Sequence, residues 1–171
     1  MSQPERLSAV QHIGVTVTDL ERSIDWYTQV LGRSPTPVAS NGGPRLARAL
    51  GLGDDVELRY AFFELENVLF ELVCYSAPDS RPNDRLVSDV GAVHVCFEVS
   101  DIEAAQERLR ALGVEFASEP LDLVDGPMKG VRYVYFRDPD GVALQLLQPP
   151  SAQGRGPRSV SEKDFARGLA T

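Results

Sequence analysis

The chain has 171 residues, of which 43% are hydrophobic, and its formal net charge is -8 at pH 7. That length suffices to bury a core in one compact unit or in two closely packed half-domains. The acidic balance disfavours nucleic acid and anionic membrane surfaces as partners. We therefore expect a protein whose partner is a small-molecule substrate.

The start of the chain, MSQPERLSAV, lacks the basic and apolar regions of a secretory signal. No apolar run approaches the ~18 residues of a membrane span. We expect a cytoplasmic protein on this basis. Because Cys74 and Cys96 stand far apart, with no Cys-x-x-Cys motif, we interpret them as ordinary buried thiols rather than as a disulfide or a structural zinc site.

The first predicted element is a short alternating strand that starts at His12. An amphipathic helix follows, with apolar residues at helical spacing and with Gly32 where a C-terminal cap belongs. Thr18 and Glu21 have the spacing of a capping box, in which a hydroxyl and a carboxylate satisfy the first backbone donors of a helix. We expect the helix to begin there.

Two strands joined at Glu66-Asn67 are predicted next, over residues 57–65 and 68–75. Between the helix and this hairpin lies the segment ASNGGPRLARALGLGDD, residues 39–55. It makes the first half of the chain longer than the second. We expect this insertion to be a loop with a short helix.

The second half of the chain repeats the first, as alignment of residues 12–32 with residues 94–113 reveals. His94 matches His12, and Ser100 with Glu103 repeats the capping box. The apolar helix positions and the final glycine also recur, namely Ile102, Ala105, Leu109, Leu112 and Gly113. A second hairpin is predicted over 131–137 and 142–148, around the turn Asp138-Pro139-Asp140-Gly141.

The repeat predicts an α+β fold of two tandem βαβββ modules, which form a cupped mixed sheet with helices on its convex side. The first module spans residues 8–76 and the second spans residues 91–148. Residues 149–171 are rich in Pro, Gly, Ser and Arg, and we expect a mobile tail with a short helical turn near 162–169.

Strand alternation separates two faces in each module. His12 and His94 lie on the polar faces of their strands, and alignment of the hairpins sets Glu71 opposite Gln145. Glu71 and Gln145 stand in apolar strands, where an unsatisfied amide costs about 1–3 kcal/mol and a carboxylate costs more. One divalent metal ion bound by these four residues would satisfy both side chains and leave open coordination positions, as in catalytic sites.

At these residues the chain resembles the vicinal oxygen chelate superfamily, which includes glyoxalase I, methylmalonyl-CoA epimerase, extradiol dioxygenases, fosfomycin-resistance enzymes and bleomycin-binding proteins. The resemblance covers residues 8–148 and rests on QHIGVTVTDLERSIDWYTQVLG, LFELV, VHVCFEVSDIEAA and YFRDPDGVALQL. It implies that the metal ligands are His12, Glu71, His94 and Gln145. The ion's identity stays open among Zn, Ni, Co, Mn and Fe. Catalytic relatives usually have Glu at the position of Gln145.

The resemblance implies a glyoxalase-like or epimerase-like lyase or isomerase, in which the metal chelates a small carbonyl or carboxylate substrate and an enediolate-type intermediate forms. Because Gln145 is no useful base, proton transfer falls to Glu71, to Glu98 or to a side chain that the sequence does not identify. Cys96 lies on the same strand face as His94, where it either only fills space or contributes to the site. Lys129 and Arg132 are candidates for binding an anionic substrate, although such residues are more often solvated.

Two alternatives stay open. An extradiol-type Fe(II) dioxygenase also uses two histidines and one carboxylate, but that carboxylate belongs where Gln145 stands. A non-catalytic binding protein, such as an antibiotic-sequestering resistance protein, needs no metal ligands, and the retention of both histidines disfavours it. Relatives pair modules within or between chains, and the strand edges that such pairing covers lead us to expect a homodimer.

Overall fold

The computed structural model describes residues 7, 9–53, 56–77, 80, 81 and 83–150. The chain divides into two compact units, residues 1–82 and 83–171, which correspond to the two halves of the repeat. The elements of the first unit are β1 (His12–Thr16), α1 (Leu20–Leu31), β2 (Ala39–Gly42), α2 (Pro44–Leu50), β3 (Glu57–Glu64) and β4 (Leu69–Ala77). Those of the second unit are β5 (His94–Glu98), α3 (Ile102–Ala111), β6 (Leu121–Asp122), β7 (Arg132–Arg137) and β8 (Ala143–Gln148).

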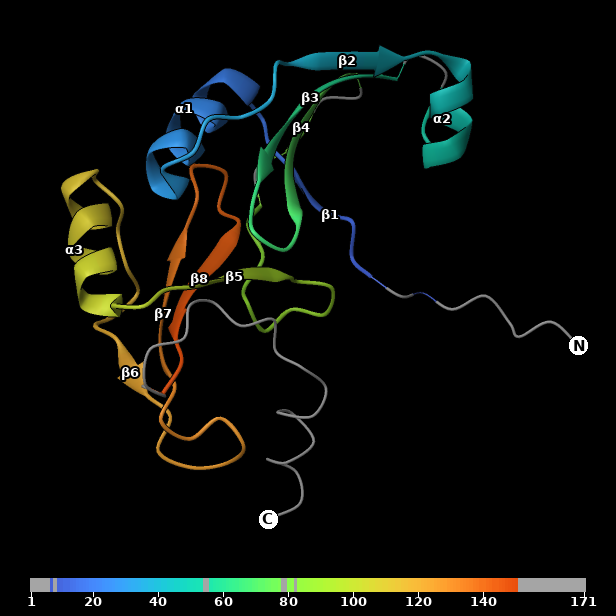
Figure 1. Cartoon of the computed structure of the whole chain (residues 1–171). Helices are drawn as coiled ribbons and strands as arrows, with labels where there is room; N and C mark the ends of the chain where they lie inside the picture. Colours follow the sequence, from blue (N-terminus) through green and yellow to red (C-terminus); the bar gives the residue numbers. More distant parts are fainter. Residues whose placement is uncertain (1–6, 8, 54–55, 78–79, 82, 151–171) are drawn as a thin grey trace, which may run out of the picture. The chain divides into compact units, whose positions relative to one another are not determined.

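Each unit has its own four-stranded sheet, with strand order β1-β4-β3-β2 in the first unit and β5-β8-β7-β6 in the second (Figure 1). The first strand of each module runs parallel to the last, and all other neighbours are antiparallel. The predicted α+β class with two tandem βαβββ modules is therefore confirmed. Among the described residues, no helix combines the length and the apolar character that crossing a membrane requires.

The core of the first module lies between its sheet and α1. Tyr27 of α1 is fully buried, and its ring centroid lies 5.0 Å from that of Phe70 and 6.4 Å from that of Phe63. Phe70 and Leu72 of β4 are buried on this face, whereas Glu71 between them is only partly buried. Strand alternation thus gives each sheet one face for packing and leaves the other face for ligands.

The second module repeats this arrangement with α3. Ile102 and Leu109 of the helix are buried, as are Val134 and Leu144 of the sheet. Leu112 had been expected in the apolar stripe of the helix, but it is 41% exposed. Leu112 is the C-cap residue of α3. Its backbone no longer follows the helix, so its side chain does not continue the buried stripe that faces the sheet.

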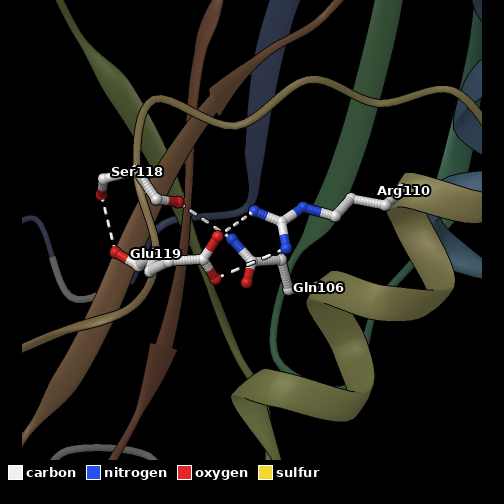
Figure 2. A network of polar contacts seen from close by, with 4 residues as sticks. All are labelled: Gln106, Arg110, Ser118 and Glu119. Carbon is white, nitrogen blue, oxygen red and sulfur yellow. Dashed lines mark hydrogen bonds and ion pairs between the residues drawn. The ribbon is translucent and has the colours of Figure 1, made fainter.

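A polar network fastens α3 to the segment that follows it (Figure 2). The buried Gln106 donates from Nε2 to the backbone oxygen of Ser118, at 3.0 Å. One turn later, Arg110 Nη2 pairs with Glu119 Oε1 at 2.6 Å. Gln106 can therefore be buried without an unsatisfied amide N–H, and α3 is held at the edge that leads to β6.

The helix starts differ from the predicted capping boxes by one residue. Asp19 and Asp101 are the N-caps, and their carboxylates accept from the backbone N–H of Arg22 and Ala104, both at 3.0 Å. Each aspartate follows the hydroxyl residue that the capping-box prediction had chosen, so that prediction was wrong. An aspartate at this position also interacts favourably with the positive end of the helix dipole.

The segment 39–55 contains more structure than the loop and short helix that we expected. The short helix is present as α2, but Ala39–Gly42 forms strand β2, which pairs antiparallel with β3. β2 is the second strand of its module and corresponds to β6 in the other module, so the extra residues lie after it. The expected helical turn near residues 162–169 lies outside the described residues.

The turn between β7 and β8 organises the start of the second module. The buried carboxylate of Asp138 accepts from the backbone N–H of Asp140 at 2.9 Å and of Val142 at 2.8 Å. Asn83, in the segment that leads into this module, donates its backbone N–H to Asp140 and its side-chain N–H to the oxygen of Gly141. The entering chain is therefore attached to the turn by two hydrogen bonds.

Candidate metal centre

The first candidate ligand pair consists of His12 on β1 and Glu71 on the neighbouring parallel strand β4. Glu71 is the register partner of Gly14, which places its side chain on the same face as His12. His12 Nε2 lies 3.7 Å from Glu71 Oε2, and the side chains are 47% and 18% exposed. Both groups are therefore reachable from solvent, with the carboxylate the more buried of the two.

The other ring nitrogen of His12 is held by its neighbour. Nδ1 lies 2.5 Å from Oε1 of Gln11, so the tautomer with the proton on Nδ1 donates to that oxygen. Its Nε2 then keeps a free lone pair on the side of Glu71. A hydrogen bond that fixes the tautomer in this way is typical of histidines that bind metal ions.

The second pair consists of His94 on β5 and Gln145 on the parallel strand β8. Gln145 is the register partner of Cys96, so His94 and Gln145 lie on one face, as His12 and Glu71 do. Gln145 is only 9% exposed, and its side chain makes no hydrogen bond to another described residue. Its polar atoms are not among the fully buried ones that lack a partner, so the amide keeps access to solvent and its oxygen is available to a ligand.

An aromatic ring stands beside each histidine. Phe62 on β3 lies edge-on to His12 with ring centroids 6.1 Å apart, and Tyr135 on β7 lies edge-on to His94 at 5.3 Å. Phe62 and Tyr135 are the register partners of Glu71 and Gln145. The sequence reasoning missed both rings, although the alternation of the two hairpins already placed them on the ligand faces.

The donor chemistry of both pairs fits a divalent metal ion. Ligand atoms about 2.0–2.2 Å from one ion lie roughly 3–4 Å from each other, which includes the 3.7 Å between His12 Nε2 and Glu71 Oε2. Imidazole nitrogen with carboxylate or amide oxygen suits first-row transition metals. Within the part of the chain that the structure describes, no three His, Cys, Asp or Glu side chains gather in one place. Each module thus supplies one pair.

Glu98 and Cys96 extend the ligand face of the second module. Both are exposed residues of β5 and alternate with the buried Val95. Although the residue as a whole is exposed, desolvation of its thiol raises the pKa of Cys96 to about 11, and the carboxylate of Glu98 adds to this shift.

The expectation of two buried cysteines was wrong. By exposed surface, Cys96 is an exposed residue and Cys74 is only partly buried.

Arg132 points away from the ligand face. It alternates along β7 with Tyr133 and Tyr135, and its guanidinium pairs with Glu103 of α3 and, at 3.1 Å, with Asp122 of β6. These contacts raise the pKa of Arg132, and the largest cause is the hydrogen bond that Arg132 donates to Glu103. The structure therefore places Arg132 on the helix-packing side of its sheet.

Lys129, the other candidate for anion binding, lies in the exposed segment between β6 and β7. Its backbone N–H donates to the oxygen of Gly126, at 3.1 Å. No polar partner of its side chain is present among the described residues. The proposed role of Lys129 in substrate binding therefore stays a prediction.

Comparison with known proteins shows the family of this chain. Residues 9–146 match the model of the Glyoxalase/Bleomycin resistance protein/Dioxygenase superfamily. A 2-epi-5-epi-valiolone epimerase from Actinomyces sp is 37% identical over 147 residues, which cover 84% of this chain and 80% of the epimerase. A lactoylglutathione lyase from Pseudomonas aeruginosa is 30% identical over 157 residues, which cover 85% of this chain and 86% of the lyase.

Solved structures share the fold. A glyoxalase family protein from Bacillus cereus superposes with a TM-score of 0.72 at 21% identity, covering 88% of this chain and 99% of that protein. The fosfomycin resistance protein FosX from Listeria monocytogenes, solved with Mn(II) and sulfate, superposes with a TM-score of 0.56 at 19% identity, covering 84% and 93%. At these identities the likeness extends to the fold alone.

Proposed function

Because the chain belongs to the Glyoxalase/Bleomycin resistance protein/Dioxygenase superfamily, we propose that it is a metal-dependent enzyme of the epimerase or lyase type. Its reaction moves a proton at a carbon next to a carbonyl group. The observation that carries this proposal is the paired arrangement of His12 with Glu71 and of His94 with Gln145. Similarity to a 2-epi-5-epi-valiolone epimerase favours the epimerase type over the lyase type.

In this proposal His12, Glu71, His94 and Gln145 together hold one divalent ion. The ion would supply Lewis-acid chemistry, drawing charge from the substrate carbonyl and lowering the cost of removing the neighbouring proton. Two imidazoles, one carboxylate and one amide form a set with one negative charge. Such a set leaves part of the ion's charge for the substrate.

Proton transfer falls to the carboxylates of this chain. Glu98 is exposed on the face of His94, and its side chain has no polar partner among the described residues, whereas Glu71 lies beside His12. We assign Glu98 as the first candidate base and Glu71 as the second. The base removes the proton from the carbon next to the carbonyl, and the electron pair is held as an enediolate. Delivery of a proton to the opposite face, by the other carboxylate or by water, then inverts that carbon.

Metal content and proton exchange test the proposal. The purified protein is analysed for bound metal, then incubated in D2O with 2-epi-5-epi-valiolone or with the hemithioacetal of methylglyoxal and glutathione, and deuterium incorporation is followed by NMR. We expect one ion per chain and exchange with the first substrate, which is lost after chelation and in His12→Ala and His94→Ala. Bound metal without exchange of either substrate would falsify the enzymatic proposal.

The stoichiometry separates one shared ion from two independent ones. Four ligands on one ion predict one ion per chain, with loss of binding when either histidine is replaced. Two ions per chain, each lost with only one of the two histidines, would contradict the shared ion. Absence of metal together with tight binding of an apolar small molecule would instead favour a binding protein.

We also propose that the protein forms a homodimer. β1 and β5 each end the strand order of their own sheet, and Val10 and Val93, just before these strands, are 67% and 74% exposed. Apolar residues beside a terminal strand favour pairing with a further element. Light scattering coupled to size-exclusion chromatography is expected to give twice the mass of the chain, and a monomer mass would contradict the dimer.

A further inference from the structure

Gly14 and Cys96 occupy the same position in the two modules. Gly14 is the register partner of Glu71, and Cys96 is the register partner of Gln145. Each residue therefore stands directly beside the oxygen-bearing ligand candidate of its module. The modules differ at both positions. Gly14, which has no side chain, lies beside the carboxylate of Glu71, whereas Cys96 lies beside the amide of Gln145.

The carboxylate of Glu71 lies where a side chain at position 14 would begin. A Cβ added to Gly14 would stand 3.0 Å from Glu71 Oε2, closer than the 3.4–4 Å of ordinary van der Waals contact, so the carboxylate would have to shift by a few tenths of an ångström. The same oxygen approaches His12 Nε2 to 3.7 Å. The carboxylate of Glu71 therefore lies beside the histidine in a position that the Cβ of any residue other than glycine at position 14 would crowd.

Cys96 fills the corresponding space in the second module. Its Cβ and sulfur stand on the ligand face beside Gln145, and the described residues include no polar contact between His94 and Gln145. His94 and Gln145 thus make no hydrogen bond to each other, although Gln145 as a whole is only 9% exposed.

We propose that positions 14 and 96 determine which module supplies the charged metal ligand. Gly14 is a positioning residue that admits the Glu71 carboxylate beside His12, whereas Cys96 keeps a carboxylate on β8 from taking the equivalent place beside His94. The effect of both positions on metal binding rests on the proposed function. The effect of Gly14 on the position of Glu71 is testable without a metal.

Gly14→Ala tests the first half of the proposal. The new methyl group meets the flexible end of Glu71 rather than backbone, and alanine is about 0.5–1 kcal/mol better than glycine in a strand, so the melting temperature should stay equal or rise. Metal affinity should fall by about tenfold, the usual effect of losing a group that orients a ligand. Gly53→Ala is the matched control, because a Cβ there meets nothing within 4 Å.

An exchange of ligands tests the second half. The double variant Glu71→Gln with Gln145→Glu keeps the same set of donor groups and moves the carboxylate to β8. We expect it to bind Mn(II) or Co(II) at least about tenfold more weakly than the unaltered protein. Adding Cys96→Gly should restore most of the affinity. Wild-type affinity in the double variant, or no recovery in the triple variant, overturns this half.

Crystal structures of the metal-free Gly14→Ala and Gly53→Ala proteins make the result independent of metal binding. The distance from His12 Nε2 to Glu71 Oε2 should exceed 3.7 Å only in the first variant. An unchanged distance overturns the positioning role of Gly14 even if the metal proposal holds. A longer distance in a protein that binds no metal supports the positioning role while the proposed function fails.

Discussion

Tyr135 lies edge-on to His94, with ring centroids 5.3 Å apart and planes inclined at 74°. The contact joins two strands that are not neighbours, because β8 stands between β5 and β7. Phe62 makes the equivalent contact with His12, at 6.1 Å and 80°. In both modules an aromatic ring from the third strand thus restricts the orientation of the histidine on the first.

Removal of the Tyr135 ring should loosen His94. An aromatic pair contributes about 0.5–1.5 kcal/mol beyond its buried area, so Tyr135→Ala should weaken metal binding about two- to tenfold, whereas Tyr135→Phe should change it little. NMR of the metal-free protein provides a direct measurement, because the chain has only two histidines. The His94 signals should move in Tyr135→Ala while those of His12 stay. Movement of both sets would contradict a local effect.

Gly141→Ala should destabilise the protein far more than Gly113→Ala. Both glycines have φ of 84°, where alanine is strained by about 1 kcal/mol, but a Cβ at Gly141 would also clash with the backbone oxygen of Asn83. Nothing lies within 4 Å of a Cβ at Gly113. We expect a loss of about 3 kcal/mol or more against about 1 kcal/mol, measured by urea unfolding. Equal losses would show that Asn83 moves aside at no cost.

Arg132→Gln should leave catalysis almost unchanged. The guanidinium faces Glu103 and Asp122 on the helix side of the sheet, and the side chain of Arg132 is 28% exposed while those of its partners are 57% and 66% exposed. Loss of these partly exposed pairs should leave the midpoint of urea unfolding almost unchanged, because solvent screens them. The Michaelis constant for the substrate should stay within about twofold. A tenfold rise with unchanged stability would restore Arg132 as a substrate-binding residue.

The Cys96 thiol of the metal-free protein should react with iodoacetamide only at unusually high pH. Desolvation first, and the carboxylate of Glu98 second, raise the pKa of this thiol from its ordinary value to about 11. Because the folded pKa is raised, folding favours the neutral thiol. The associated stabilisation is complete below the unfolded pKa and is lost as the pH rises toward 11.

The Cys74→Ser protein isolates the Cys96 reaction, and the alkylation rate of Cys96 is measured against pH. An inflection near the ordinary value would contradict the shift. Glu98→Gln should move the inflection down, because it removes the second cause but leaves desolvation in place. Thermal unfolding of both proteins across the same pH range serves as the control for loss of structure.

Strand alternation carried most of what could be predicted. His12, Glu71, His94 and Gln145 stand on the predicted faces because period-two patterning leaves little freedom once the opposite face is apolar. Arg132 was predictable in the same way, since it alternates with Tyr133 on a strand whose buried face holds Val134. Its charge alone had made it a candidate for substrate binding, whereas its position in the strand predicts the helix side of the sheet.

Other features depend on contacts that no local pattern records. Ala39–Gly42 reads as ASNG, which has no strand propensity, and becomes a strand only because β3 offers it an edge. The choice of Asp19 over Thr18 as N-cap depends on where the strand ends. The backbone N–H of Arg22 donates to the carboxylate of Asp19, whereas the hydroxyl of Thr18 accepts only from the guanidinium of Arg22. The place of Gly14 beside Glu71 depends on the pairing of β1 with β4, which no pattern within either strand records.

The parallel pairing of β1 with β4, and of β5 with β8, has a consequence for folding kinetics. Each pairing joins the two ends of its module, so its loop must close after the local hairpin and helix have formed. His12 and His94 stand on the strands that this late step secures. We therefore expect metal binding during refolding to lag behind the return of helical signal, because the ligands assemble only when the last strand of each module has docked.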